Sequence, residues 1–205
     1  MLKELGAEVV YQGNIDAANP DLTPEILRMR NAGAEAIMPW SVNPGFLSRI
    51  INTRGQMQWD VPIVGQTTLG SGQTQALLEK PEYWAKVYPN NFRPVCYSPD
   101  GKLSDRTAGF LERLKSAKIE VSDTLLWWVA LGYDSPRLIA EAMKSGTEPS
   151  QIVGYFNQLK GYGGVYGNIS FTSERHDGYP DEQVVMVEAN SLKNGAFRLA
   201  PGYGA

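Results

Sequence analysis

The repeated order of strand, loop and helix in the first half of the chain is the feature that most constrains the fold. Short apolar runs at 35–40 ("EAIMPW") and 61–65 ("VPIVG") alternate with segments that have helix start and stop signals. In "TPEILRMRNAG", Thr23 is the N-cap candidate and Pro24 the first helical residue, and "NPGFLSRIINTRG" (43–55) repeats this pattern with Asn and Pro. Because the units recur about every 25 residues, we predict an α/β fold, a parallel sheet with helices on both faces.

The first residues, "MLKELGAEVVYQG", are typical of the end of a helix followed by a strand. The predicted helix covers Leu2 to Leu5, Gly6 ends it, and the strand runs from Glu8 to Tyr11. An isolated helix this short is unstable in water, because nucleation is costly. We therefore expect this chain to be the later part of a longer protein, a truncated fragment.

The second half is richer in helical patterns. An amphipathic helix is expected after Ser104 or Asp105, followed by a long apolar helix over 123–146 that Pro136 should kink or restart. The Trp127-Trp128 pair within this helix is predicted to belong to the core, since its neighbours are apolar on all sides.

The last part of the chain predicts one more helix and a hairpin. The helix should start at Thr147 or Glu148, and a short strand is expected at "NISF" (168–171). The tail 183–199 is predicted to form two strands, joined by a turn with the dipeptide Asn194-Gly195, a strong hairpin signal.

Composition excludes several classes of partner. The net charge is −3 and no run of Lys and Arg stands out, so we expect no nucleic acid partner. No stretch approaches the ~20 apolar residues of a membrane span, and the N-terminus has no signal-peptide pattern. Any export signal would therefore lie upstream.

No catalytic or metal-binding pattern is present, so we predict that the protein is not an enzyme and has no cofactor. It has one cysteine, Cys96, and one histidine, His176, too few for a common zinc site. His176 has no G-x-S-x-G serine motif near it, and "GSGQTQ" lacks the lysine of a phosphate-binding loop. A small α/β enzyme remains an alternative, and a reactive Cys96 would be its sign.

A binding function uses the loops that follow the second and third strands, since ligands of parallel sheets lie beyond the carboxyl ends of the strands. In "PWSVNPG", Trp40 can stack, and Ser41 and backbone N–H groups can donate to an anion near the helix start at Pro44. The same residues also suit core packing and helix capping. The predicted ligand-binding residues are Trp40, Ser41, Val42, Gln66, Thr67, Thr68 and Tyr133. Tyr133 and Asp134 could instead satisfy backbone groups beside Pro136.

Taken in order, seven pieces of the sequence resemble the type I periplasmic substrate-binding proteins of ABC transporters, in particular the branched-chain amino-acid (leucine/isoleucine/valine-binding) family. The resemblance covers essentially all 205 residues, but only the C-terminal portion of such a protein. The pieces are "LKELGAEVV", "AGAEAIMPW", "VPIVGQTTLGS", "FLERLK", "ALGYDSPRLIAEAMKSG", "GGVYGNISF" and "GAFRL".

The resemblance implies a fold of two α/β lobes with the ligand held in the cleft between them. By this analogy, 1–95 and 180–205 form the second lobe, whose lead strand is missing. The helical segment 103–165 is the returning part of the first lobe, and 96–102 and 166–179 are crossing segments.

The function implied is that of an extracytoplasmic, periplasmic component of an ABC importer, with a small solute and the transporter permease as partners. The alternative is a ligand-sensing regulatory domain of the same fold. In amino-acid-binding members, an acid just after the third strand pairs with the ligand's ammonium group, whereas Gln66 and Thr67 stand there in this chain. Because a buried ammonium without a counter-charge is costly, we expect a carboxylate, an aromatic acid, an amide or a similar solute. A branched-chain amino-acid-like solute stays an alternative, since an acid from the missing lobe could supply the counter-charge.

A missing lobe would also uncover apolar helices. We expect Leu125, Leu126, Trp128 and Leu131 to be exposed in the fragment, and the chain to form a homo-oligomer through this surface.

Overall fold

The computed structural model describes residues 4, 6–121 and 125–203. The chain folds into two compact units, Met1–Pro89 and Asn90–Ala205. Among the described residues, no helix is both long and apolar enough to cross a membrane.

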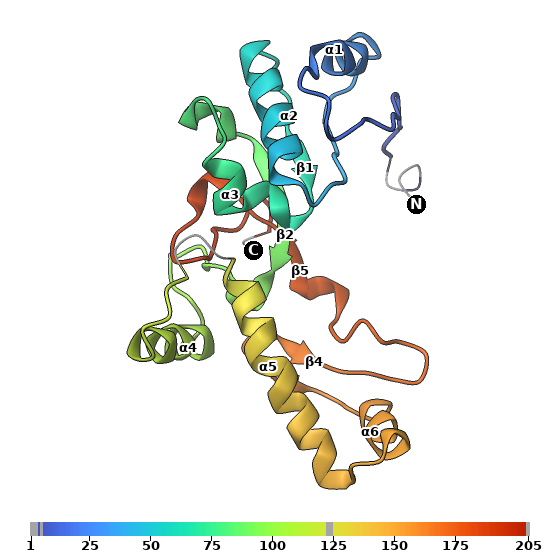
Figure 1. Ribbon diagram of the computed structural model, residues 1–205, viewed down its shortest axis with the longest axis vertical. Helices are drawn as coiled ribbons and strands as arrows, with labels where there is room; N and C mark the ends of the chain where they lie inside the picture. Colours follow the sequence, from blue (N-terminus) through green and yellow to red (C-terminus); the bar gives the residue numbers. More distant parts are fainter. Residues whose placement is uncertain (1–3, 5, 122–124, 204–205) are drawn as a thin grey trace. The chain divides into compact units, whose positions relative to one another are not determined.

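Unit 1 contains three α-helices, β1 and the first half of β2 (Figure 1). Its elements are α1 (Thr23–Asn31), α2 (Pro44–Gln56), β1 (Ile63–Gly65), α3 (Gly72–Gln75) and the 3₁₀-helices η2 (Thr67–Gly70) and η3 (Pro81–Trp84), followed by β2 (Val87–Phe92), which continues into unit 2.

The paired segments of unit 1 are parallel, as the sequence predicts. Strand β1 pairs with β2 in the register Ile63↔Val87, and Ile37 forms an isolated parallel bridge with Ile63. The Ile37 N–H donates to the Pro62 carbonyl at 3.0 Å, and the Val64 N–H donates to the Ile37 carbonyl at 2.9 Å. The short apolar runs at 35–40 and 61–65 are therefore neighbours in space.

Helix α2 forms where its signals predict. The Asn43 side chain is the N-cap and accepts the Phe46 N–H at 3.1 Å, and Pro44 occupies the first turn. Its apolar residues Phe46, Leu47, Ile50 and Ile51 are buried.

Three local predictions for unit 1 are wrong. Residues 8–11 form no strand, and Val9 and Val10 are exposed. The N-cap of α1 is Leu22 instead of Thr23, because the Asp21 carboxylate already accepts the Thr23 N–H at 2.9 Å. The run 35–40 pairs only at its bridge. The predicted helix end at 2–5 lies outside the described residues except for Glu4.

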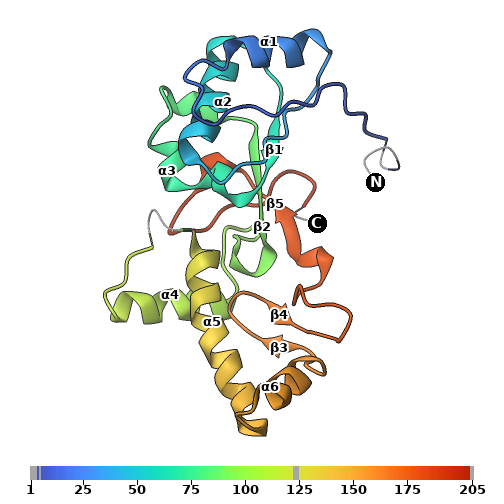
Figure 2. The same ribbon diagram turned by 45° about the vertical axis from the view of Figure 1, so that its right-hand side comes forward.

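Unit 2 contains three α-helices and short antiparallel pairs. Its elements are η4 (Arg93–Val95), α4 (Asp105–Ser116), α5 (Leu126–Ala142), η5 (Met143–Ser145), α6 (Pro149–Phe156), β3 (Tyr162–Gly163), β4 (Asn168–Ile169), η6 (Asp181–Gln183), β5 (Val184–Met186) and η7 (Ala189–Ser191). Figures 1 and 2 show α4 on one side of α5 and β4 on the other.

The helix starts predicted for unit 2 are confirmed in α4 and α6, whose N-caps are Ser104 and Glu148. Helix α5 continues through Pro136 and is not restarted there. Gly132, four residues before, is exposed, so its carbonyl can bond water in place of the N–H that proline lacks.

The tail of unit 2 turns back on itself as the dipeptide Asn194-Gly195 predicts. Both residues have positive φ, 52° and 73°, as a type I′ turn requires. Antiparallel bridges join Lys193 to Ala196 and Val187 to Leu199. Strand β5 pairs antiparallel with the second half of β2, so the sheet is mixed and not purely parallel.

The core of unit 2 buries apolar side chains that the sequence predicts to be exposed. Leu125 and Leu126 are buried, together with Phe110 and Trp127, which corrects the expected exposure of the two leucines. Trp128 is 56% exposed, which agrees with its expected exposure and corrects the prediction that it belongs to the core with Trp127. Homo-oligomer formation stays a prediction.

The observed units also differ from the predicted lobes. Residues 180–205 belong to the same compact unit as 103–165, whereas the resemblance groups them with 1–95. The assignment of segments to lobes stays a prediction.

Arg54 should be a main stabilising residue of unit 1. Its buried guanidinium donates to the carbonyls of Val61 (2.9 Å), Ala85 (3.0 Å) and Tyr83, and burial lowers its pKa. Arg54→Met leaves these carbonyls without their donor, and we expect it to reduce the free energy of unfolding by about 2–3 kcal/mol. Urea denaturation measures this, with Arg30→Met on the exposed face of α1 as control. Equal stability of the two variants would contradict it.

Candidate functional site

The candidate site lies at the carboxyl ends of the paired segments in unit 1. The bridge between Ile37 and Ile63 is parallel, so the loops that follow both segments leave the same edge. A side chain at Gly65 would place its Cβ 3.0 Å from the Pro39 carbonyl oxygen and 2.9 Å from Leu69 Cδ1. The loops at 39–43 and 65–71 are therefore in direct contact where they begin.

The first loop presents apolar side chains to solvent. Trp40 is 85% exposed and Val42 79% exposed, whereas Ile37 and Pro39 are buried. This alternation shows that Trp40 does not pack in the core of unit 1, which corrects the packing alternative for this residue.

Ser41 has a local structural role. Its Oγ accepts the Asn43 N–H at 3.1 Å, and Asn43 in turn caps α2. Since Pro44 has no N–H and the Phe46 N–H is taken by Asn43, the first turn of α2 offers an anion mainly the Gly45 N–H. The predicted donation from Ser41 and the helix start is thus weaker than the sequence suggests.

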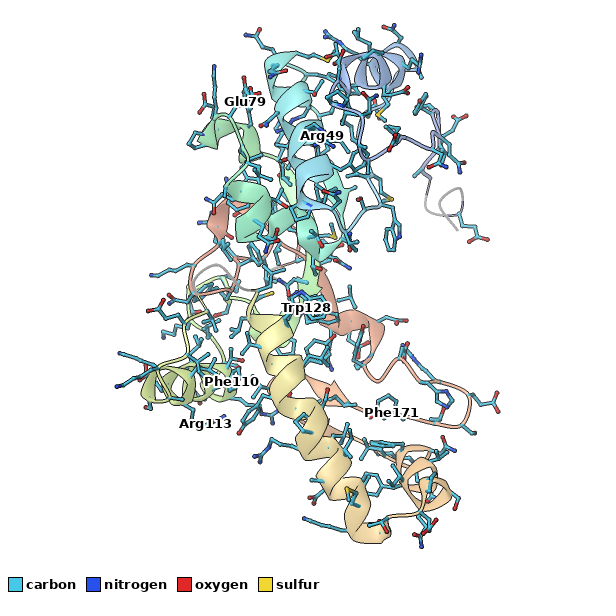
Figure 3. The ribbon with its side chains drawn as sticks, in the orientation of Figure 1. Arg49, Glu79, Phe110, Arg113, Trp128 and Phe171 are labelled. Atoms are coloured by element: carbon cyan, nitrogen blue, oxygen red, sulfur yellow. The ribbon has the colours of Figure 1, made fainter. Side chains whose placement is uncertain are left out.

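A cation lies beside this helix start. Arg49 on α2 (Figure 3) donates through Nη2 to the Ala17 carbonyl, and its Nε is buried without a hydrogen-bond partner. Its Nη1 lies 3.6 Å from the position that a Cβ at Gly45 would occupy. No acidic side chain pairs with Arg49 in the part of the chain that the structure describes. Sequence reasoning missed this residue, because Arg49 looks like an ordinary polar position of an amphipathic helix.

The second loop has a fixed backbone and free side chains. The Thr68 carbonyl accepts the Thr74 hydroxyl at 2.8 Å, the Trp84 Nε1–H donates to the Leu69 carbonyl at 3.5 Å, and Ser71 caps α3. By contrast, the side chains of three half-buried residues make no hydrogen bond to any described part of the chain. These residues are Gln66, Thr67 and Thr68.

The seventh predicted residue, Tyr133, lies in unit 2 on α5. Its ring contacts Phe110, with a centroid distance of 4.9 Å, and its hydroxyl makes no hydrogen bond within the described ranges. Asp134 beside it is buried and accepts the Tyr166 N–H at 2.7 Å, so it holds a backbone group of a distant segment and not one beside Pro136.

Trp128 in the same unit was missed as a candidate contact. Its ring stacks on Trp127 with a centroid distance of 4.1 Å, and the residue is 56% exposed; Figure 3 labels it on α5. The sequence predicts both core packing and exposure for Trp128, and the observed packing shows that its face is free.

Cys96 lies in an environment that does not favour a reactive thiol. Cys96 is buried, its Sγ–H donates to the Phe92 carbonyl at 3.2 Å, and burial raises its pKa to about 12. No cluster of His, Cys, Asp and Glu that could hold a metal ion occurs among the described residues.

We predict that Cys96 reacts with a thiol reagent only after unfolding. A thiol with this pKa is almost entirely protonated at pH 8, and the thiolate is the reactive form. Labelling by 5,5′-dithiobis(2-nitrobenzoate) should be at least 100-fold slower in buffer than in 6 M guanidinium chloride. Comparable labelling rates in buffer and in guanidinium chloride would contradict this prediction and favour the enzyme alternative.

We predict that Gly65→Ala disturbs the candidate site. The added methyl group overlaps the Pro39 carbonyl and Leu69, so the two loops must separate, at a cost of about 1–3 kcal/mol. Gly132→Ala is the control, because a Cβ there meets nothing within 4 Å and an exposed helical alanine is neutral or favourable. A thermal denaturation midpoint for Gly65→Ala equal to that of the control would show that the loop contact is looser than described.

No family model and no curated protein sequence matches the chain. Several solved structures match it. A type I periplasmic binding protein from Bordetella pertussis matches 97% of this chain with a TM-score of 0.74 at 21% identity, over 54% of its own length.

Two further matches were solved with a ligand. A solute-binding protein of an ABC transporter from R. palustris, in complex with 4-hydroxybenzoate, matches 98% of the chain (TM-score 0.68, 17% identity, 55% of its length). A branched-chain amino acid transporter substrate-binding protein from Streptococcus pneumoniae, in complex with isoleucine, matches 93% (TM-score 0.65, 22% identity, 53% of its length).

These matches, together with the helices and the small mixed sheet, confirm the fold predicted from the sequence. The chain spans about half the length of the solved proteins that it matches. It has, over that length, the fold of the type I periplasmic binding proteins.

Proposed function

We propose that this chain belongs to the extracytoplasmic solute-binding component of an ABC importer and binds a small organic carboxylate. The observation that supports this most directly is that the half-buried, unbonded polar side chains Gln66, Thr67 and Thr68 lie in one loop and the exposed Trp40 in the other, where the two loops begin in contact. A small-molecule site needs an apolar wall and a few placed polar groups, and these loops supply both.

The charges near the loops favour an acid over an amino acid. Neither loop, 39–43 or 65–71, contains an acidic residue, and Glu35 and Asp60 precede the paired segments, at their opposite ends. Arg49 provides a cation near the first turn of α2. The positive charge of Arg49 therefore matches a carboxylate group of the ligand, whereas an ammonium group would lack a counter-charge in these loops.

Two of the matched structures hold ligands of these two classes, an acid and an amino acid. One was solved with 4-hydroxybenzoate, an aromatic acid, and another with isoleucine. Trp40 and the absence of an acid in the loops support an aromatic carboxylate for this chain. Val42 is proposed to extend the apolar wall, and Tyr133 stays a prediction as a further contact. The permease is the proposed partner, and the periplasm the proposed location.

Binding can be tested by isothermal titration calorimetry. The probes are 4-hydroxybenzoate, benzoate, benzamide and isoleucine. We expect the two aromatic carboxylates to bind most tightly, and Trp40→Ala to weaken them about tenfold, or ~1.4 kcal/mol, through the lost ring contact.

The control is Leu27→Ala, which removes an exposed apolar side chain from α1 without touching the loops. It should leave the affinities unchanged. Preferential binding of isoleucine, or aromatic acid binding that Trp40→Ala does not alter, would overturn the proposal.

A further inference from the structure

Two arginine side chains lie close to the ring of Tyr133. The guanidinium carbon of Arg113, from α4, lies 5.6 Å from the centroid of the Tyr133 ring, and that of Arg137, one turn further along α5, lies 5.1 Å from it. Figure 3 shows Arg113 and Phe110 on α4 beside α5. Residues from two helices of unit 2 therefore bring two cations to one aromatic ring.

The Tyr133 ring is positioned by its packing on the core of unit 2. Tyr133 packs on Phe110 with a centroid distance of 4.9 Å, and Phe110 is fully buried in the core of unit 2. Arg113 also contacts the Phe110 ring, at 5.8 Å. Contacts between a cation and an aromatic ring at the surface contribute about 0.5–1 kcal/mol each, enough to favour one arrangement of long side chains.

Neither arginine has an acidic partner among the described residues. Glu141, one turn after Arg137, pairs with Lys144 at 2.6 Å. Asp134 is buried and accepts the Tyr166 N–H.

The remaining charged groups of the two helices do not neutralise the pair. Glu112 directly precedes Arg113 and points to a different side of α4, since neighbours in a helix are rotated by about 100°. Arg106, two turns earlier, adds a third cation and donates to the Gly164 carbonyl at 2.8 Å. The acids of α4 and α5 equal the cations of these helices in number, but within the described ranges no carboxylate pairs with Arg113 or Arg137.

The distances from the Tyr133 ring allow the two guanidinium groups to meet one oxyanion. Both lie within 5.6 Å of the same centroid, so they are at most about 11 Å apart. An oxyanion bonded to two guanidinium groups at N–O distances near 2.8 Å holds their carbons about 8 Å apart. The planar fork of arginine suits the paired oxygens of phosphate and carboxylate.

We propose that Arg113 and Arg137, together with the free hydroxyl of Tyr133, form a binding site for a small dianionic oxyanion, a phosphate or a dicarboxylate. The site lies entirely in unit 2. Apart from Tyr133, which stays a predicted further contact of the solute, its argument uses no residue of the solute site proposed in unit 1, so either proposal can fail without the other.

Isothermal titration calorimetry at constant ionic strength tests the site. Inorganic phosphate and succinate are the two probes, and the tighter of them identifies the class of anion. We expect Arg113→Gln and Arg137→Gln each to weaken the preferred probe at least tenfold, and Arg113→Lys, which keeps the charge but loses the fork, to weaken it less.

Lys115→Gln is the matched control, because Lys115 is an exposed cation in the same last turn of α4 and contacts no ring among the described residues. It should leave binding within twofold of the unchanged protein. Urea denaturation of every variant separates loss of binding from loss of folding. Equal weakening by Lys115→Gln would show diffuse attraction instead of a site, and failure of both probes to bind the folded, unchanged protein would also overturn the proposal.

Discussion

The parallel pairing between Ile37 and Ile63 is the constraint on which the candidate site depends. Two main-chain hydrogen bonds, from Ile37 to Pro62 and from Val64 to Ile37, fix the direction of both segments. Because the segments run in the same direction, the loops that follow them begin side by side, with Gly65 against the Pro39 carbonyl. This pairing therefore determines that the loops carrying Trp40 and Gln66 leave the same edge.

In the loop at 65–71, hydrogen bonds hold the backbone in place while the polar side chains stay unbonded within the described chain. The backbone of 68–71 is bonded by Thr74 and Trp84, whereas the side chains of Gln66, Thr67 and Thr68 bond nothing in the described chain. A site built in this way loses little conformational freedom when a ligand replaces water, because the loop that carries the polar groups is already ordered.

Sequence reasoning succeeded where the signal is local. Asn43 and Pro44 start α2, Ser104 starts α4, and Asn194-Gly195 forms its turn, because each structure depends on a few neighbouring residues. The loops that follow Ile37 and Gly65 also begin in contact, as parallel pairing predicts, and their role in ligand binding stays a prediction.

Sequence reasoning failed where tertiary packing decides. A strand is predicted at 8–11, but a strand needs a partner and none pairs with it in the described structure. For Trp128 the sequence predicts both core packing and exposure, and only the packing of Trp127, Ala130 and Leu138 determines which face of α5 is covered. Similarly, no sequence pattern places Arg113 over the ring of a tyrosine twenty residues away.

The central claim is that the two loops of unit 1 form the solute site, and NMR tests it most directly. Titrating 4-hydroxybenzoate into the ¹⁵N-labelled protein should shift amide signals of 40–46 and 66–71, and leave those of α1 unchanged. Shifts confined to other parts of the chain, or spread evenly over both units, would contradict the account.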